Sequence, residues 1–177
     1  MGSSKFFSER SDACEVAQWA REVGEKYFTS LFALQRFVLE EIQGLDINVV
    51  TPQMIPGCCC FAAPVVTAAL REKGCKDAAT VTGKHNESSW HAWTQVSLCD
   101  GDFVIDSTYA QFLHVPDTFL VYPTTELSHR SLTHTGAHPE YDDSLTDFVR
   151  TQYRTDVRRL LRNMFETLVF CGGAEGT

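Results

Sequence analysis

The stretch from Ala78 to Thr108 limits the fold more than any other part of this 177-residue chain. It contains three short runs rich in β-branched and aromatic residues, AATVTGK, WHAWTQVSL and DFVIDST, separated by polar residues. Such runs are typical of half-buried β-strands. The sequence LCDGDFVI places Asp-Gly between two of them, which predicts a hairpin of two adjacent antiparallel strands. The fold must therefore include an antiparallel sheet.

Apolar residues spaced three and four apart predict helices before and after these strands. One such pattern covers residues 12–42, and Gly24 or Thr29–Ser30 can divide it into two helices. A second helix is expected over residues 62–73. It should end at Gly74, because glycine readily adopts the left-handed conformation that follows many helices.

The C-terminal part of the chain combines a polar stretch with a final helix. Residues 123–144 are rich in His, Thr, Pro and Gly, and we interpret them as a long loop or lid. Residues 145–170 carry an apolar face at helical spacing. This order of elements predicts an α+β fold in a single domain over residues 1–177, with residues 1–12 disordered and a catalytic core at about residues 53–122.

Composition argues against several classes of partner. Hydrophobic residues make up 44% of the chain and charged residues 21%, as in ordinary folded domains. The net charge of −8 offers no electrostatic attraction to nucleic acid or to an anionic membrane surface. No apolar run approaches the ~20 residues needed to span a bilayer, and the N-terminus lacks the apolar region of a signal peptide. Seven cysteines without such a signal predict reduced thiols.

Three consecutive cysteines, Cys58, Cys59 and Cys60, lie where a proline-containing loop leads into the second expected helix. A thiol is nucleophilic as its anion, which a helix N-terminus stabilises and a neighbouring imidazole generates. His91 begins one expected strand and Asp106 ends the next. If these strands pair, both side chains come to one end of the sheet, where the carboxylate can orient the imidazole. The pattern predicts nucleophilic thiol chemistry.

Each of these residues also has a purely structural interpretation. The cysteines can be small buried hydrophobes at a tight junction between loop and helix. His91 can be a half-buried strand histidine that is hydrogen-bonded to the backbone. Asp106 can cap the end of its strand ahead of Ser107 and Thr108. The three residue types follow one another along the chain as Cys, His and Asp, the order that nucleophilic thiol chemistry uses. This order favours the catalytic interpretation.

A zinc site is the main chemical alternative. Adjacent cysteines lack the spacing of two to four residues that is usual for zinc ligands. A second candidate cluster comprises His129, His134, His138 and Asp142, but its spacing matches no known metal signature. We therefore expect neither a metal nor a cofactor.

Together, the segments GCCCFAAPVVTAALREKG, WHAWTQV and FVIDSTYAQF resemble the papain-like superfamily, especially its transglutaminase-like and glutamine-deamidase branches. Many bacterial toxins and effectors belong to these branches. The resemblance covers about residues 53–112. It implies a papain-like fold, in which a central helix bearing the nucleophile packs on a small antiparallel sheet flanked by N- and C-terminal helices. It also implies a Cys-His-Asp triad and says little about the substrate.

The resemblance also ranks the cysteines. Members of the family carry a glycine two residues before the nucleophile and often an oxyanion-hole glutamine six residues before it. Gly57 and Gln53 stand at these offsets from Cys59. The family's aromatic residue directly after the nucleophile favours Cys60 instead, because Phe61 follows it. We prefer Cys59 as the nucleophile and keep Cys60 as the alternative, with Gln53 as an expected oxyanion donor by resemblance.

The expected activity is that of a cysteine-dependent amide hydrolase or acyl transferase, and by resemblance the deamidation of glutamine in a protein substrate is favoured. A cysteine peptidase and a transglutaminase use the same triad, and both stay open. A non-catalytic binding module on the same scaffold is the alternative from another class. The expected partner is a protein, with neither nucleic acid nor membrane involved. The expected location is the cytoplasm, or the cytosol of a target cell after delivery without a signal peptide.

Overall fold

The computed structural model describes residues 7, 11–37, 59–86, 89–109, 112, 119–130, 132–137 and 155–170. The helices are α1 (Ala13–Phe37), α2 (Cys59–Glu72) and α5 (Thr155–Phe170). The strands are β1 (Ala79–His85), β2 (Ser89–Leu98), β3 (Gly101–Asp106), β4 (Leu120–Pro123) and β5 (Leu132–Ala137). Two short 3-10 turns, η2 (Thr124–Glu126) and η3 (Ser128–Arg130), lie between β4 and β5. The predicted α+β class is confirmed.

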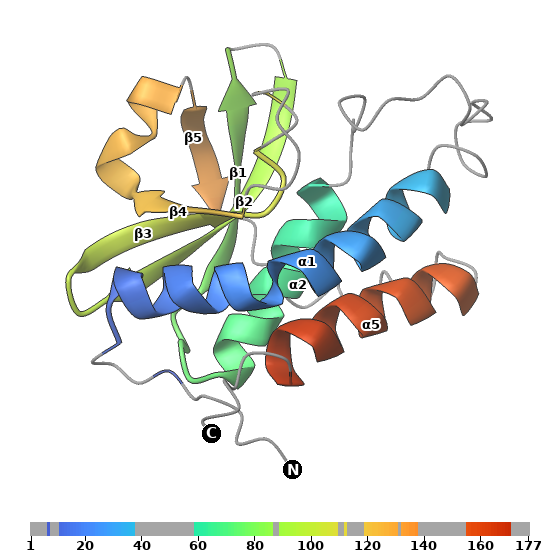
Figure 1. Ribbon diagram of the computed structural model, residues 1–177. Helices are drawn as coiled ribbons and strands as arrows, with labels where there is room; N and C mark the ends of the chain where they lie inside the picture. The colour runs from blue at the N-terminus through green and yellow to red at the C-terminus, as the bar shows by residue number, and fades with distance from the viewer. Residues whose placement is uncertain are drawn as a thin grey trace.

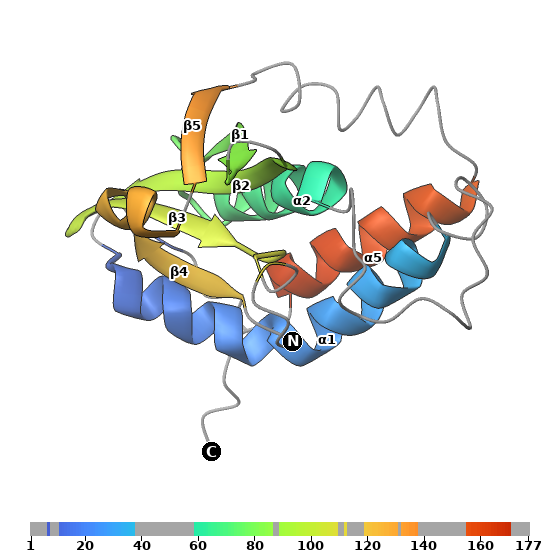
Figure 2. The same ribbon diagram turned by 90° about the horizontal axis from the view of Figure 1, so that it is seen from above.

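The strands form one antiparallel sheet in the order β4-β3-β2-β1-β5. The three helices lie on one side of this sheet, and η2 and η3 lie on the other (Figure 1). Seen from above, α2 lies beside the central strands while α1 runs along the β4 edge (Figure 2). α5 packs against both α1 and α2. The described helices therefore form a layer on one face of the sheet.

The hairpin of β2 and β3 is present, as predicted from LCDGDFVI. Leu98 pairs with Gly101, so Cys99 and Asp100 are the two central residues of the turn. The turn therefore lies one residue before the expected Asp-Gly pair. Gly101 has a φ of +135°, in the region that favours glycine, at the first position of β3.

α1 begins between two carboxylates. Asp12 Oδ1 accepts a hydrogen bond from the backbone N–H of Glu15 at 2.9 Å. The carboxylate of Asp100 accepts one from the N–H of Ala13 at 3.2 Å. The first N–H groups of a helix lack partners within it, so these side chains fix the start of α1 and tie it to the β2–β3 turn. The helix then continues to Phe37 without the division that the sequence allowed.

α2 begins at Cys59, three residues before the predicted start. At its other end the N–H of Gly74 donates to Arg71 O and the N–H of Cys75 donates to Leu70 O. This pair of hydrogen bonds, with a φ of +112° at Gly74, is a Schellman motif. The predicted end of this helix is confirmed.

Two hydrophobic clusters lie on the two faces of the sheet. The larger joins the helices to Val96 and Ile105, and within it the indole N–H of Trp19 donates to Leu168 O at 3.1 Å. The smaller lies on the far face, beneath η2 and η3, and consists of Val81, Trp93, Val104, Tyr109 and Tyr122 with partly buried neighbours. α2 is buried on nearly every side because the sheet, α1 and α5 all contribute to its surroundings.

Two expectations from the sequence are wrong. Residues 123–144 are not one long loop, because η2, η3 and β5 lie within them. The strand LTHTGA has no apolar alternation, and its pairing with β1 determines its structure. Residues 1–12 are not disordered throughout, because Phe7 is buried against Trp19, with ring centroids 5.6 Å apart. The predicted helical residues 145–154 lie outside the described part. Among the described helices, none is long and apolar enough to cross a membrane.

Candidate active site

The side chains of His91 and Asp106 lie on the face of the sheet opposite α2. Thr94 faces the helices, because its hydroxyl donates to Ala63 O of α2 at 3.0 Å. Side chains alternate along a strand, so His91, three residues earlier, faces the other way. Ile105 of β3 pairs with Thr94, which puts Asp106 on the same face as His91. The register of one hairpin thus places both residues.

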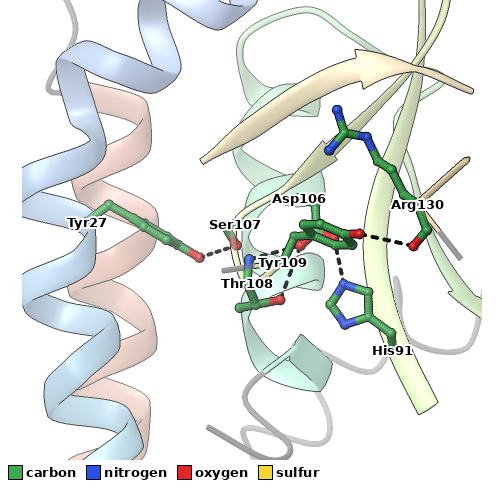
Figure 3. Close-up of polar contacts among 7 residues, drawn as sticks. All are labelled: Tyr27, His91, Asp106, Ser107, Thr108, Tyr109 and Arg130. Atoms are coloured by element: carbon green, nitrogen blue, oxygen red, sulfur yellow. Dashed lines mark hydrogen bonds and ion pairs between the residues drawn. The ribbon is translucent and has the colours of Figure 1, made fainter. Parts of the chain in front are cut away.

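The structure brings these two side chains into direct contact. His91 Nε2 lies 2.6 Å from Asp106 Oδ2, and both side chains are completely buried (Figure 3). An ionised carboxylate only accepts hydrogen bonds, so this contact puts the ring proton on Nε2. Nδ1 is then the ring nitrogen with which the imidazole can take up a proton. Such a charge-assisted bond, shielded from water, fixes the orientation of the ring.

The second oxygen of Asp106 is also held. Oδ1 accepts hydrogen bonds from the backbone N–H of Thr108 at 2.9 Å and from its hydroxyl at 3.3 Å. This is the strand-end cap that the structural interpretation of Asp106 predicted. The two interpretations are compatible, because each uses a different oxygen.

Aromatic rings surround the imidazole of His91. The ring centroids of Trp93, Tyr109 and Phe112 lie 5.9, 6.5 and 4.9 Å from that of His91. His85 stacks on Phe112 at 3.8 Å, almost parallel to it. Burial lowers the pKa of His85, and the nearby charge of His91 lowers it further. These rings exclude water from the His91–Asp106 pair, which strengthens the electrostatic interaction within it.

Cys59 is the first residue of α2 and lies against β2. It is 4% exposed and forms a small cluster with Ala63 and Ala92. Two turns further along the helix, the Thr67 hydroxyl contacts the hydroxyl of Thr94 on the same strand. The stripe of α2 that faces β2 thus begins at Cys59. The partial positive charge of a helix N-terminus acts on a thiol at this position.

Not every candidate residue is described. Gln53 and Cys58 lie outside the described residues, and so does the side chain of Cys60, whose backbone belongs to the first turn of α2. The preference for Cys59 over Cys60 therefore stays a prediction, as does the oxyanion role of Gln53.

The described part of the chain includes two of the four residues of the alternative metal cluster. His129 is exposed on η3, and His134 lies in β5 at the position paired with Gly83. His138 and Asp142 are not among the described residues. Within the described ranges, no group of three His, Cys, Asp or Glu residues could hold a metal ion.

Sequence reasoning missed Tyr27, Tyr109 and Arg130. Their contacts surround the turn after Asp106 (Figure 3). The Tyr109 hydroxyl donates to Arg130 O at 3.0 Å, and the Arg130 guanidinium lies 4.1 Å from the ring centroid of Tyr122. Tyr27 falls in the apolar pattern of α1, so nothing in the sequence distinguishes it from an ordinary core residue.

Comparison with family models, with curated proteins and with solved structures finds no match for this chain. What the site does must therefore be inferred from its own geometry.

Proposed function

We propose that this chain is a cysteine-dependent amide hydrolase or acyl transferase of papain-like type. Cys59 would be the nucleophile, His91 the general base and acid, and Asp106 the group that orients the imidazole. The observation that carries the proposal is the buried 2.6 Å contact between His91 and Asp106. On the other face of β2, the cysteine at the start of α2 packs on Ala92, the residue that follows His91.

The thiol and the imidazole approach the sheet from opposite faces, and the end of β3 offers a route between them. β3 pairs with β2 only from Thr94 to Leu98. At His91, the described part of the chain gives β2 a hydrogen-bonded neighbour only on its β1 side, at Gly83. We infer that Cys59 reaches Nδ1 of His91 around the end of β3.

The chemistry follows from these roles. The Cys59 thiol gives its proton to His91 and attacks the carbonyl carbon of an amide as a thiolate. His91 then protonates the leaving nitrogen as the C–N bond breaks, so ammonia or an amine departs and a thioester remains. Water loses a proton to His91 and attacks the thioester. The C–S bond breaks, the proton returns to the sulfur, and a carboxylic acid is released.

The molecule that accepts the acyl group from the thioester decides the overall reaction. Water as the acceptor gives deamidation when the substrate is a glutamine side chain, and proteolysis when it is a peptide bond. A second amine gives transglutamination. We favour deamidation of glutamine in a protein, because the sequence resembles effector-type deamidases in the segments around Cys59, His91 and Asp106.

Thiol labelling tests the nucleophile. Iodoacetamide is applied at about pH 6, where an ordinary thiol is protonated and slow to react. The background variant lacks three other cysteines, through the substitutions Cys14→Ser, Cys99→Ser and Cys171→Ser. We expect rapid labelling of one thiol, lost in Cys59→Ala, kept in Cys60→Ala, and slowed at least about tenfold in His91→Gln. Cys75 serves as an internal control, because burial raises the pKa of its thiol to about 11.

Turnover tests the reaction. A blocked glutaminyl-glycine dipeptide is incubated with the protein, with and without hydroxylamine, and the products are identified by mass. Ammonia release with a gain of about 1 Da indicates deamidation, a hydroxamate indicates acyl transfer, and free glycine indicates peptidase activity. Absence of all three products, together with uniformly slow labelling of every thiol, would contradict an enzymatic function and favour the binding module.

A further inference from the structure

Residues 106–109 comprise the last residue of β3 and the turn that follows it, and three of them are each bound to a different part of the fold. Asp106 contacts His91 of β2, Ser107 contacts Tyr27 of α1, and Tyr109 donates to Arg130 O of η3 (Figure 3). The remaining residue, Thr108, donates back to Asp106 within the turn. The position of the carboxylate therefore depends on a helix and on a 3-10 turn as well as on its own strand.

The contact with α1 comes from farthest away in the sequence. The Tyr27 hydroxyl lies 3.0 Å from Ser107 Oγ, and the two residues are 80 positions apart. Tyr27 is completely buried and Ser107 is 4% exposed, so both hydroxyls are shielded from bulk water. A buried polar group that loses its hydrogen-bonding partner is costly, so the bond constrains both sides.

The ring of Tyr27 is itself fixed in place. It packs edge-on against Phe28 and Phe119, with centroids 5.6 and 5.2 Å away. Phe119 immediately precedes β4, the strand that pairs with β3. The hydroxyl that meets Ser107 is therefore presented from a rigid position rather than from a mobile side chain.

Ser107 transmits this constraint to Asp106 because the two residues are adjacent in the chain. A hydrogen bond of 2.6 Å tolerates little displacement, and directional bonds weaken steeply as their geometry worsens. Catalytic groups must be held to within a fraction of an ångström, so a small movement of the turn would misplace the imidazole.

We propose that Tyr27 is a positioning residue for the His91–Asp106 pair and acts through Ser107. The effect on turnover rests on the proposed function. The effect on the imidazole does not, and it can be measured without a substrate.

Proton NMR of protein labelled with ¹⁵N-histidine tests this inference. The His91 ring N–H signal is assigned through its loss in His91→Gln. We expect Tyr27→Phe and Ser107→Ala each to move this signal and to speed its exchange with water by about tenfold, as for the loss of one hydrogen bond. The double variant should be no worse than either single variant, because both substitutions remove the same contact.

Thr67→Val is the matched control, because it removes a buried hydroxyl bridge between α2 and the sheet that does not involve the turn. It should leave the His91 signal unchanged. An unchanged signal in a folded Tyr27→Phe variant would overturn the inference, and Ser107→Ala decides if Tyr27→Phe does not fold. If the wild type turns over the glutamine dipeptide, Tyr27→Phe should lower kcat about tenfold at constant KM. Complete inactivity of the wild type would count against the proposed function alone.

Discussion

Asp106 accepts hydrogen bonds on both carboxylate oxygens, and the donors come from opposite sides. Oδ2 faces the imidazole of His91, while Oδ1 faces the N–H and the hydroxyl of Thr108. Only a group with two accepting oxygens satisfies donors on both sides. An amide of the same shape has one accepting oxygen and one donating nitrogen.

Asp106→Asn is therefore expected to change the protonation of the imidazole. With its oxygen toward the N–H of Thr108, the amide turns its NH₂ group toward His91, where it can donate only if Nε2 accepts. The imidazole then carries its proton on Nδ1 instead. The free energy of unfolding in urea should fall by about 1 kcal/mol, because a charge-assisted hydrogen bond becomes a neutral one. Labelling of Cys59 at about pH 6 should slow at least about tenfold, because Nδ1 then carries a proton and cannot accept the one from the thiol.

Asp77→Asn is the control for loss of one negative charge. Asp77 is exposed, and its Oδ2 accepts a hydrogen bond from the N–H of Ser97 at 2.9 Å. A single amide oxygen can replace that acceptor, so stability should change by less than about 0.5 kcal/mol. Equal effects of the two substitutions would mean that charge, and not hydrogen-bond geometry, determines the role of Asp106.

At the scale of elements, three hydroxyls join α2 to the sheet. The Thr94 hydroxyl donates to Ala63 O, so its oxygen accepts the proton of Thr67, 3.0 Å away. The proton of Thr67 is thereby used, and its oxygen accepts from Thr80, 2.9 Å away. A hydroxyl has only one proton, so the bonds run in one direction, from β1 through α2 to β2 and back to α2. This chain of bonds joins α2 to both β1 and β2.

Thr67→Val keeps the shape of the side chain and removes the central hydroxyl. We expect a loss of about 1–3 kcal/mol in the free energy of unfolding, because two buried hydrogen bonds disappear. Thr167→Val provides the comparison, since its hydroxyl donates to Asn163 O on the exposed side of α5 and should matter by less than about 0.5 kcal/mol. If Thr67→Val lowers the free energy of unfolding as little as Thr167→Val does, packing alone holds α2 on the sheet.

Regular spacing made the main elements predictable, but not the contacts between them. The apolar spacing of α1 and α2 and the hairpin of β2 and β3 sufficed to predict the α+β class and the meeting of His91 with Asp106. β5 was missed because its Thr and His residues show no alternation, and only pairing with β1 makes it a strand. Tyr27 was missed because a hydrogen bond across 80 residues leaves no local pattern.

At the scale of the whole molecule, burial of weak acids makes the fold sensitive to alkali. Burial raises the pKa of the Cys75 thiol from 9.0 to about 11, and the Asp77 carboxylate adds to the shift. Burial also raises the pKa values of Tyr109 and Tyr122. Burial of Lys73 lowers the pKa of its ammonium group. Its contribution to the pH dependence of stability therefore has the opposite sign.

For Cys75, the raised pKa fixes the sign of the change in stability with pH. Above about pH 9 the unfolded chain loses the thiol proton while the folded chain keeps it, so the free energy of unfolding falls until about pH 11. We expect Cys75→Ala to show a shallower decline over this interval when urea unfolding is followed at several pH values. Lys73 and the tyrosines are common to both proteins, so their contributions cancel in the difference. Parallel curves would contradict the assignment.

The two hydrogen bonds that join α1 to the β3 hairpin set a length requirement. Ala13 and Tyr27 are 14 residues apart on a helix, a span of about 21 Å. Their partners Asp100 and Ser107 directly flank β3 and are seven positions apart, a span of about 23 Å for extended chain. The length of α1 between its two anchoring residues therefore matches the length of the chain segment that carries their partners. One residue inserted between Ala13 and Tyr27 would rotate one anchor by about 100° relative to the other. Within this interval α1 should tolerate changes of sequence far better than changes of length.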